Sequence, residues 1–351
     1  MIRRALQRLL DGQELANGEI EGSVREIAEG KATQALMGAF LVALRLKGET
    51  PREVATFAST LREYSVLIAP SVSGKLVDTC GTGGDRVKTF NVSTLSALVA
   101  SGAGASVAKH GNRSVTSRCG SADLLERLGF NLNATPEVVK QSIENVGIGF
   151  MFAPVFHPAM KHVASVRKEL GVRTIFNLMG PLLNPASANA QVVGVYEAAL
   201  VEKVAEVLRM MGVEEAMVVH GLEGMDEISL SGKTLVAQLK GGEVKTCEYS
   251  PADFGMEKVQ TTGGEVEGIE EGARVALQVL DGHSLETVMT KMVVVNSAAA
   301  LVVVGRADDF AEAVGQAEES LASGSAMRKL KELVKHSGGD ASRVEVIAKN
   351  R

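Results

Sequence analysis

Short apolar segments that alternate with helix-like segments run through the middle of this 351-residue chain. Residues 75–80 and 105–109 have the character of strands, and a helix-like segment at about 93–101 lies between them. Further strand-like segments follow at 149–153, 191–196 and 215–220, with a helix at about 197–211. Strands joined by helices form right-handed crossovers between parallel neighbours. The order therefore predicts an α/β fold in which helices flank a mainly parallel central sheet.

The first 69 residues have a different pattern, which is helical throughout and shows no alternation of period two. Thr50, Pro51 and Glu53 together mark a helix start, with a capping hydroxyl, a proline at the first position and a glutamate at the third. Residues 31–46 carry apolar side chains around most of a helix, more than one buried face needs. Such a helix is typical of a bundle interior or of a contact with another subunit.

Composition narrows the class of protein. Aromatic residues are only 4% of the chain and Trp is absent, so Ala, Val, Leu, Ile and Met must build the core. A formal charge of −5 argues against a surface that coats nucleic acid, and an anionic substrate would need a local basic pocket. Cys80, Cys119 and Cys247 are widely spaced, which indicates reduced thiols and neither a disulfide framework nor a zinc site. The chain shows no signal peptide, and its longest apolar stretch, 292–304, is too short to span a bilayer. We expect a cytoplasmic protein.

Residues 157–185 contain helical material inserted into the α/β pattern. We expect this insert to pack back onto the N-terminal helices and to form the second wall of a cleft. The predicted domains are a small helical domain, residues 1–69 plus about 160–180, and a large α/β domain, residues 70–159 and 181–351. Residues 232–268 predict an irregular peripheral hairpin region, and the polar tail after Gly338 permits no assignment.

A glycine-rich stretch, Gly81-Thr-Gly-Gly-Asp85, follows the first predicted strand. Glycines there let backbone N–H groups converge on one point, and the helix that follows adds its positive N-terminal end. Asn91, Ser93 and Thr94 supply side-chain donors at the same helix start, and Ser93 could ligate a metal. The pattern suits a pyrophosphate, although a tight turn with ordinary capping residues would look the same. It is neither a Walker A motif nor a GxGxxG fingerprint.

A second polar stretch, Lys109-His-Gly-Asn-Arg-Ser-Val-Thr-Ser117, follows the next predicted strand. Ligands of parallel sheets gather beyond the carboxyl ends of the strands, so this loop should face the glycine-rich stretch. Cations and hydroxyls that suit a polyanion are concentrated in and just after it: Lys109, Arg113, Arg118, Ser114, Thr116, Ser117 and Ser121. Read alone, these residues could simply be surface side chains.

Asp226 and Glu227 follow the strand-like residues 215–220 and a short glycine-containing loop. Adjacent carboxylates at the end of a strand suit Mg²⁺, which keeps several waters and bridges to phosphate oxygens. Most adjacent Asp-Glu pairs are solvated surface. A metal-binding role is more favoured for this pair, because a phosphate-binding loop creates the need for a cation.

Together the three motifs and the segment from His157 to Pro185 resemble the anthranilate phosphoribosyltransferase family over roughly residues 1–335. Ser325 departs from that pattern, because a Lys is expected there. The resemblance implies a small helical domain, a large α/β domain and homodimers formed through the helical domains. It implies transfer of the phosphoribosyl group of 5-phospho-α-D-ribose 1-diphosphate (phosphoribosyl pyrophosphate) to anthranilate, giving N-(5-phosphoribosyl)anthranilate and diphosphate in tryptophan biosynthesis.

The resemblance also implies roles for individual residues. Those that would hold phosphoribosyl pyrophosphate are Gly81, Gly84, Asp85, Thr89, Asn91, Val92, Ser93, Thr94, Lys109 and Ser121. Two Mg²⁺ ions would be held, one by Ser93 with Glu227 and the other by Asp226 with Glu227. Those that would bind anthranilate or line its path are Gly81, Asn112, Arg167, His110, His157 and Pro181.

The chemistry expected of such a site is displacement of pyrophosphate from the anomeric carbon through a loose, oxocarbenium-like transition state, without a covalent nucleophile. Two alternatives stay open from the sequence. One is a pyrimidine nucleoside phosphorylase of the same fold, whose family carries a similar KHGNR stretch, and the other is a non-catalytic relative that binds nucleic acid. The resemblance also leaves open a complex with the glutamine amidotransferase subunit of anthranilate synthase.

Overall fold

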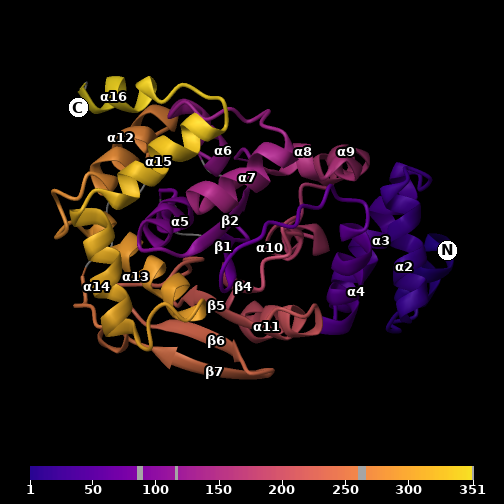
Figure 1. Cartoon of the computed structure of the whole chain (residues 1–351). Helices are drawn as coiled ribbons and strands as arrows, with labels where there is room; N and C mark the ends of the chain where they lie inside the picture. Colours follow the sequence, from indigo (N-terminus) through magenta and orange to yellow (C-terminus); the bar gives the residue numbers. More distant parts are fainter. Residues whose placement is uncertain (85–89, 115–117, 260–265, 350–351) are drawn as a thin grey trace.

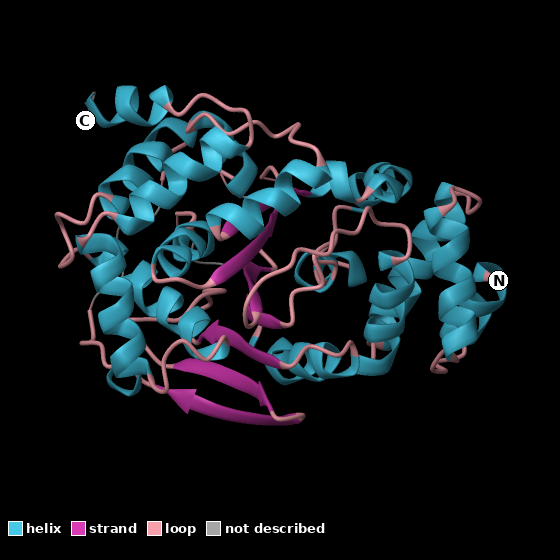
Figure 2. Ribbon diagram, viewed as in Figure 1, coloured by secondary structure: helices cyan, strands magenta, loops and turns pink. Residues whose placement is uncertain are grey.

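A seven-stranded sheet forms the centre of the protein in the computed structural model, which describes residues 1–84, 90–114, 118–259 and 266–349. The strand order is β3-β2-β1-β4-β5-β6-β7, with the first five strands parallel and the last two antiparallel. The strands are β1 Leu76–Gly81, β2 Ser106–Gly111, β3 Ile148–Phe152, β4 Ala190–Gly194, β5 Glu215–Gly221, β6 Thr234–Lys240 and β7 Glu243–Tyr249. The predicted α/β fold with a mainly parallel sheet is confirmed (Figures 1 and 2).

Four helices precede the sheet: α1 Ile2–Leu10, α2 Asn17–Ala28, α3 Gln34–Lys47 and α4 Pro51–Arg62. The predicted start of α4 is confirmed, since Thr50 Oγ1 accepts from the Glu53 backbone N–H at 3.2 Å. The Glu53 carboxylate in turn accepts from the Thr50 backbone N–H at 2.9 Å. These helices lie at the opposite end of the molecule from α12–α16 (Figure 1).

The insert between β3 and β4 contains α8 Ala153–Phe156, η1 Pro158–Met160, α9 Lys161–Leu170, η2 Ile175–Asn177 and α10 Met179–Leu182. Helix α9 contacts α2 and α3 (Figure 1). The ring of Phe176 packs edge-on against that of Phe57 in α4, with centroids 5.3 Å apart. Apolar side chains of the insert thus share one core with the N-terminal helices.

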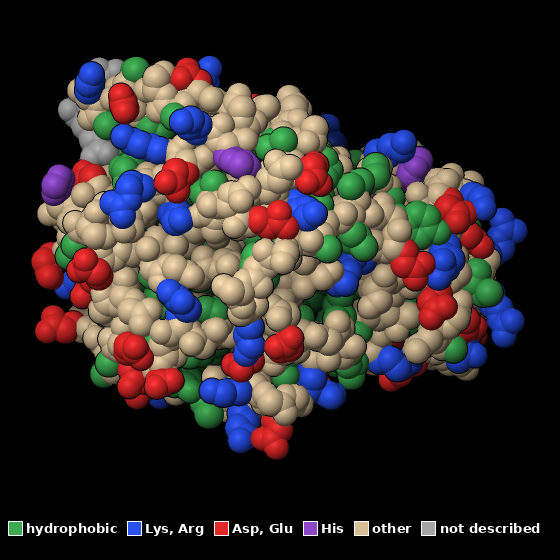
Figure 3. Space-filling view, in the orientation of Figure 1, with side chains coloured by type: hydrophobic (Ala, Val, Ile, Leu, Met, Phe, Trp, Pro, Cys, Tyr) green, Lys and Arg blue, Asp and Glu red, His purple; other side chains and the backbone are tan. Residues whose placement is uncertain are grey.

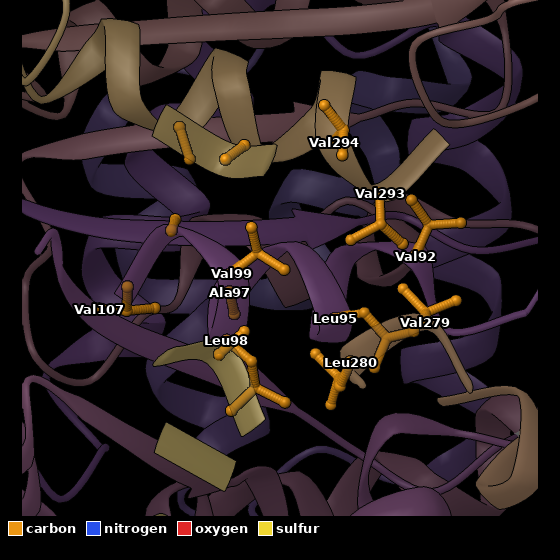
Figure 4. Packing of buried hydrophobic residues seen from close by; sticks show 14 of the residues in the cluster. Val92, Leu95, Ala97, Leu98, Val99, Val107, Val279, Leu280, Val293 and Val294 are labelled. Carbon is orange, nitrogen blue, oxygen red and sulfur yellow. The ribbon is translucent and has the colours of Figure 1, made fainter. Parts of the chain in front are cut away.

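The helices on the sheet are α5 Val92–Gly102, α6 Ser121–Arg127, α7 Pro136–Val146, α11 Val201–Met210, α12 Ile269–Leu280, α13 Val288–Val303, α14 Phe310–Ala322, α15 Ser325–His336 and α16 Ser342–Lys349. Helix α5 is buried along nearly its whole length. Its Leu95 and Leu98 lie in one apolar cluster with Val279 and Leu280 of α12 and Val293 of α13 (Figure 4). The element that follows the glycine-rich stretch is therefore anchored in the middle of the core.

Two sequence-based expectations need correction, and one segment that the sequence left unassigned has a regular structure. The hydroxyl of Ser121 before an apolar helical segment predicts a helix cap at this residue. In the structure Ser121 is instead the first residue of α6, and Gly120 occupies the capping position. The first part of residues 232–268 is a regular antiparallel hairpin, β6–β7, which extends the sheet, and residues 260–265 lie outside the described residues. The polar tail forms α16, whose Val344 and Ile347 are buried in the main core.

Acidic and basic side chains are interspersed over the surface in Figure 3. That distribution agrees with the small net charge of −5. Among the helices of the described ranges, none combines the length and the apolar character needed to cross a lipid bilayer.

Candidate active site

The glycine-rich loop begins where β1 ends, and two hydrogen bonds fix its first residues. The Thr82 N–H donates to the Gly194 carbonyl at 2.9 Å, and the Gly83 N–H donates to Asp226 Oδ2 at 3.0 Å. A Cβ atom on Gly81 would lie only 2.5 Å from Asp226 Oδ2, so a side chain here would displace the Asp226 carboxylate. Gly84 has a φ of +76°, in the left-handed region that glycine favours. Of the predicted donor-binding residues, Asp85 and Thr89 lie outside the described residues.

The N-terminus of α5 carries polar atoms that the protein itself does not satisfy. Asn91 precedes the helix, and its side chain makes no capping hydrogen bond. Its Nδ2 donates to the Cys119 carbonyl at 3.1 Å, whereas its Oδ1 and the Thr94 Oγ1 are buried without a partner in the described part of the chain. Ser93, between them, is half-buried. Buried polar atoms are nearly always paired in folded proteins, so this helix start is built to receive a ligand.

The second polar loop supplies one buried cation. Lys109, at the end of β2, is buried, and its Nζ donates to the His110 carbonyl at 3.2 Å. No Asp or Glu of the described ranges forms an ion pair with Lys109. Arg113 is different, because it pairs with Asp123 at 2.9 Å and with Glu126 at 2.7 Å. Unlike Arg113, Lys109 therefore remains available to an anion, although its charge also interacts with the buried Asp78 carboxylate.

The rest of this loop holds the start of α6 in place. The Asn112 carbonyl accepts from Ser121 Oγ at 3.2 Å and from the Ala122 N–H at 3.2 Å. The Ser114 N–H donates to Asp123 Oδ2 at 2.9 Å. Arg118 is exposed. Thr116 and Ser117 lie outside the described residues.

A buried carboxylate that the sequence analysis did not select lies beneath both loops. Asp78 of β1 accepts the His110 N–H at 3.2 Å through Oδ1 and Asn184 Nδ2 at 2.8 Å through Oδ2. Burial raises the pKa of this carboxyl. Gln191 of β4 donates to the Pro181 carbonyl at 2.9 Å. These bonds fasten α10, which contains Pro181, to the strands that end at the two loops.

Two histidines form a hydrogen-bonded chain beside α10. His110 Nδ1 lies 3.0 Å from the Gly180 carbonyl, the two Nε2 atoms of His110 and His157 are 3.0 Å apart, and His157 Nδ1 lies 2.8 Å from Ser65 Oγ. Because a carbonyl only accepts, His110 carries its proton on Nδ1 and accepts through Nε2. His157 must then donate from Nε2 and accept from the Ser65 hydroxyl. The partners thus fix the direction of the whole chain.

Burial keeps both imidazoles neutral. It lowers the pKa of His110 to about 3, with a smaller contribution from His157, and lowers the pKa of His157 to about 4. Both rings are therefore uncharged at neutral pH. All four ring nitrogens have partners within the protein, so the pair forms a neutral wall and holds no proton in reserve.

Arg167 is the partly buried cation of the insert. Its guanidinium carbon lies 5.7 Å from the centroid of the Phe176 ring. Burial lowers the pKa of this guanidinium, and within the described ranges no carboxylate or carbonyl pairs with it. A desolvated guanidinium without an acceptor is suited to bind a planar carboxylate through paired hydrogen bonds.

Asp226 and Glu227 follow β5 after a short loop, and the backbone of Asp226 lies directly against Gly194 of β4. Burial raises the pKa of the Cys80 thiol at the end of β1, with further contributions from Asp78 and Glu227. The acidic pair therefore lies close to the end of β1. Among the described residues no three His, Cys, Asp or Glu side chains form a complete metal-ligand group. Carboxylates and a nearby hydroxyl fit Mg²⁺, which usually takes only one or two protein carboxylates and leaves room for water and substrate phosphates.

Comparisons with known proteins bear on this site. Residues 73–327 match the model of the glycosyl transferase family α/β domain, and residues 3–65 match its helical bundle domain. An anthranilate phosphoribosyltransferase from Methanocorpusculum labreanum is 46% identical over 342 residues, which cover 97% of this chain and 99% of the relative. This chain belongs to the anthranilate phosphoribosyltransferase family.

Solved structures of the family share the whole fold. The crystal structure of the enzyme from Thermus thermophilus matches with a TM-score of 0.90 and 40% identity, and the match covers 95% of this chain and 99% of the other. The enzyme from Saccharomyces cerevisiae in complex with phosphoribosyl pyrophosphate and Mg matches with a TM-score of 0.87 and 29% identity, covering 96% and 98%. The same yeast enzyme in complex with 4-fluoroanthranilate matches with a TM-score of 0.86 and 28% identity, covering 96% and 98%.

Proposed function

We infer that this chain transfers the phosphoribosyl group of phosphoribosyl pyrophosphate to anthranilate and releases diphosphate. One observation carries the inference: the chain has two groups of polar or charged side chains that lack a full set of partners within the described residues, and each group suits a different substrate. Unpaired polar atoms of Asn91 and Thr94 lie at the start of α5. The buried Lys109 donates to the His110 carbonyl and forms no ion pair in the described ranges. Arg167, from a separate segment, is a partly buried cation without an acceptor among the described residues. The first set suits a polyanionic donor, and the second suits an acceptor with a single carboxylate.

We propose that the donor's phosphates bind at the glycine loop and the start of α5. Backbone N–H groups and the helix N-terminus stabilise phosphate oxygens, and Lys109 adds a full charge at the same place. The residues proposed for this role are Gly81, Gly84, Asn91, Val92, Ser93, Thr94, Lys109 and Ser121, together with Asp85 and Thr89. Ser121 would contribute its hydroxyl from the first turn of α6.

We propose two Mg²⁺ ions, one held by Ser93 with Glu227 and the other by Asp226 with Glu227. The yeast relative was solved with phosphoribosyl pyrophosphate and Mg. When bound, the ions would neutralise charge on the diphosphate as it departs. Asp226 already accepts the Gly83 N–H through Oδ2, so this carboxylate also fixes the glycine loop on which the donor would bind.

We propose that anthranilate binds through Arg167 and Asn112, next to Gly81, with His110, His157 and Pro181 along its path. The guanidinium of Arg167 would hold the carboxylate and so direct the amine towards the anomeric carbon. The neutral imidazoles would form an uncharged side of this path. Because all their nitrogens have partners, neither ring acts as the base. The arylamine loses its proton to solvent water or to the released diphosphate after the C–N bond forms.

Catalysis then rests on electrostatic stabilisation of the leaving group and on alignment of the amine. The bond from the anomeric carbon to the pyrophosphate oxygen breaks, and the electron pair departs with the diphosphate. Lys109 and the N-terminus of α5 stabilise that charge. No covalent intermediate with the protein is needed.

The direct test follows the loss of anthranilate fluorescence in the presence of phosphoribosyl pyrophosphate and Mg²⁺. We expect turnover that depends on all three components. A parallel reaction with orthophosphate and a pyrimidine nucleoside tests the phosphorylase alternative. Phosphorolysis in the second reaction, without consumption of anthranilate in the first, would overturn the proposed function.

We propose that the N-terminal helices with α9 form one domain and that they carry the contact of a homodimer. The apolar side chains of Met37 and Leu44 face the interior of their own bundle, so they are not the contact. Ala35, Ala39 and Leu46 lie on the opposite side of α3 and are exposed, and Leu46 is 82% exposed. Their spacing places them on one face, which gives a second copy of the chain an apolar stripe. A cytoplasmic location and an association with the amidotransferase subunit stay predictions.

A further inference from the structure

Arg173 joins the glycine loop to the insert and has no part in the proposed chemistry. It lies between α9 and η2. Its guanidinium donates to the Gly84 carbonyl, and its Nη1 lies 3.3 Å from Glu197 Oε1. The guanidinium carbon is only 3.8 Å from the centroid of the Tyr196 ring. One side chain of the insert thus contacts both the loop after β1 and the residues that follow β4.

The contact with Gly84 completes the support of the loop. Thr82 is held by β4 through the Gly194 carbonyl, and also through its Oγ1, which accepts the Tyr196 N–H at 3.1 Å. Gly83 is held by Asp226. Gly84 is held by Arg173 alone among the described contacts of its carbonyl. An anion-binding loop presents its backbone N–H groups to the anion, and the hydrogen bond from Arg173 holds the Gly84 carbonyl of this loop in place.

The same segment carries Arg167. Only six positions separate the two arginines, and Gly171 turns the chain between them with a φ of +60°. Phe176, which lies under the Arg167 guanidinium, follows Arg173 by three residues and is anchored on Phe57. A shift of the α9–η2 segment therefore moves both arginines together, one on the donor loop and one at the proposed acceptor site.

We infer that Arg173 is a positioning residue that couples the binding of the two substrates. A donor in the glycine loop fixes the Gly84 carbonyl, the Arg173 guanidinium and hence the segment that presents Arg167, so that the acceptor binds to a site already in place. Because coupling between two sites is reciprocal, a bound acceptor must tighten the donor by the same factor. This inference rests on the proposed function, since it takes the two sites to be those of donor and acceptor.

The coupling is measured with benzoate, which has the carboxylate of anthranilate but no amine and therefore cannot accept the phosphoribosyl group. Calorimetry gives the dissociation constant of benzoate with and without saturating phosphoribosyl pyrophosphate and Mg²⁺, and that of the donor with and without saturating benzoate. For the unmodified protein we expect the two ratios to agree, at about fivefold or more, as is typical of coupled sites.

Arg173→Ala should reduce both ratios to near one while each substrate alone still binds. Arg173→Lys keeps a charge that can reach the carbonyl but loses the planar stack on Tyr196, so it should keep an intermediate ratio. Lys168→Ala removes a cation from the same segment at an exposed position and should leave the ratio unchanged. Thermal unfolding checks that each variant is folded. If Arg173→Ala is not folded, Arg173→Lys alone provides the test.

An unchanged ratio in both Arg173 variants overturns the inference. So does an intact ratio with weaker binding of the donor alone, which would make Arg173 a direct phosphate ligand, and so does a ratio of one in the unmodified protein. The proposed function is tested separately by turnover of anthranilate in the unmodified protein. Turnover without coupling leaves the function standing and removes only the role of Arg173.

Discussion

Replacement of Arg167 by Ala separates recognition of the acceptor from use of the donor. Arg167 has no hydrogen-bond or ion-pair acceptor among the described residues, so the substitution breaks no polar contact of the fold. A charge-assisted hydrogen bond to a carboxylate contributes about 1.5–3 kcal/mol, which corresponds to roughly a tenfold to hundredfold change. The burial that lowers the pKa of this guanidinium also strengthens such a bond, so we expect a loss in the upper half of that range.

The loss should appear as a raised KM for anthranilate, while the KM for phosphoribosyl pyrophosphate changes little. Both constants come from initial rates of fluorescence decrease at varied concentrations of one substrate. The contact with the Phe176 ring contributes about 0.5–1 kcal/mol to stability, so the variant should stay folded. Arg167→Lys keeps the charge without the planar guanidinium, so its KM for anthranilate should lie between those of the unmodified protein and of Arg167→Ala.

Two control variants define the result. Lys109→Ala should weaken use of the donor and leave the KM for anthranilate nearly unchanged, and Lys168→Ala, one residue from Arg167, should change neither constant. If Arg167→Ala raises only the donor's KM, or leaves both constants untouched, the assignment of Arg167 to the acceptor is refuted.

Three other predictions concern the metal, the dimer and pH. Asp226→Asn combined with Glu227→Gln should lower the rate by orders of magnitude at ordinary Mg²⁺, and full activity of this double variant, or of the native chain in excess chelator, would contradict the metal assignment. Ala39→Glu with Leu46→Glu should give folded monomers in analytical ultracentrifugation, whereas an unchanged dimer would move the interface elsewhere. The pKa values of His110 and His157 fall from an ordinary 6.5 to about 3 and about 4 on folding. The neutral pair therefore stabilises the protein fully above pH 6.5, and this stability is lost as the pH falls, with His157 alone accounting for about 3 kcal/mol by pH 4. Urea unfolding at pH 7 and pH 5 measures this slope, and equal midpoints at both values would count against it.

The donor side of the site is largely predictable from the sequence because its parts are local. Strand β1, the glycine loop and α5 follow one another within residues 76–102, and each has a short-range signal in strand pattern, glycines or helix start. The start of α4 at Thr50 is equally local. Ser121 shows the limit of such signals, because Gly120 and not Ser121 occupies the capping position of α6. The Asp123 carboxylate accepts the Gly120 N–H at 3.1 Å.

The contacts that join the segments are not predictable in this way. Asp78 and Asn184 are 106 positions apart in sequence, and Arg173 and Gly84 are 89 apart. Nothing in the local pattern around Arg173 indicates its stack on Tyr196. Asp78 does leave one signal, a lone charged residue inside an apolar strand, which is costly unless it is paired. A chain of histidines ending on Ser65 likewise depends on how distant segments meet.

The enclosure of α5 also determines how the two halves of the site respond to thermal fluctuation. A helix packed on all sides exchanges its amide hydrogens only when the whole domain opens, and α5 has nearly every residue from Val92 to Ser101 buried. Helix α9 has only Val163 and Val166 buried, so its amides should exchange through small local openings. Deuterium labelling should then show slow amide exchange in α5, where the donor would bind, and fast exchange in α9, beside the proposed acceptor site. An enzyme built this way can adjust its fit to the aromatic substrate without loosening the surface that holds the phosphates.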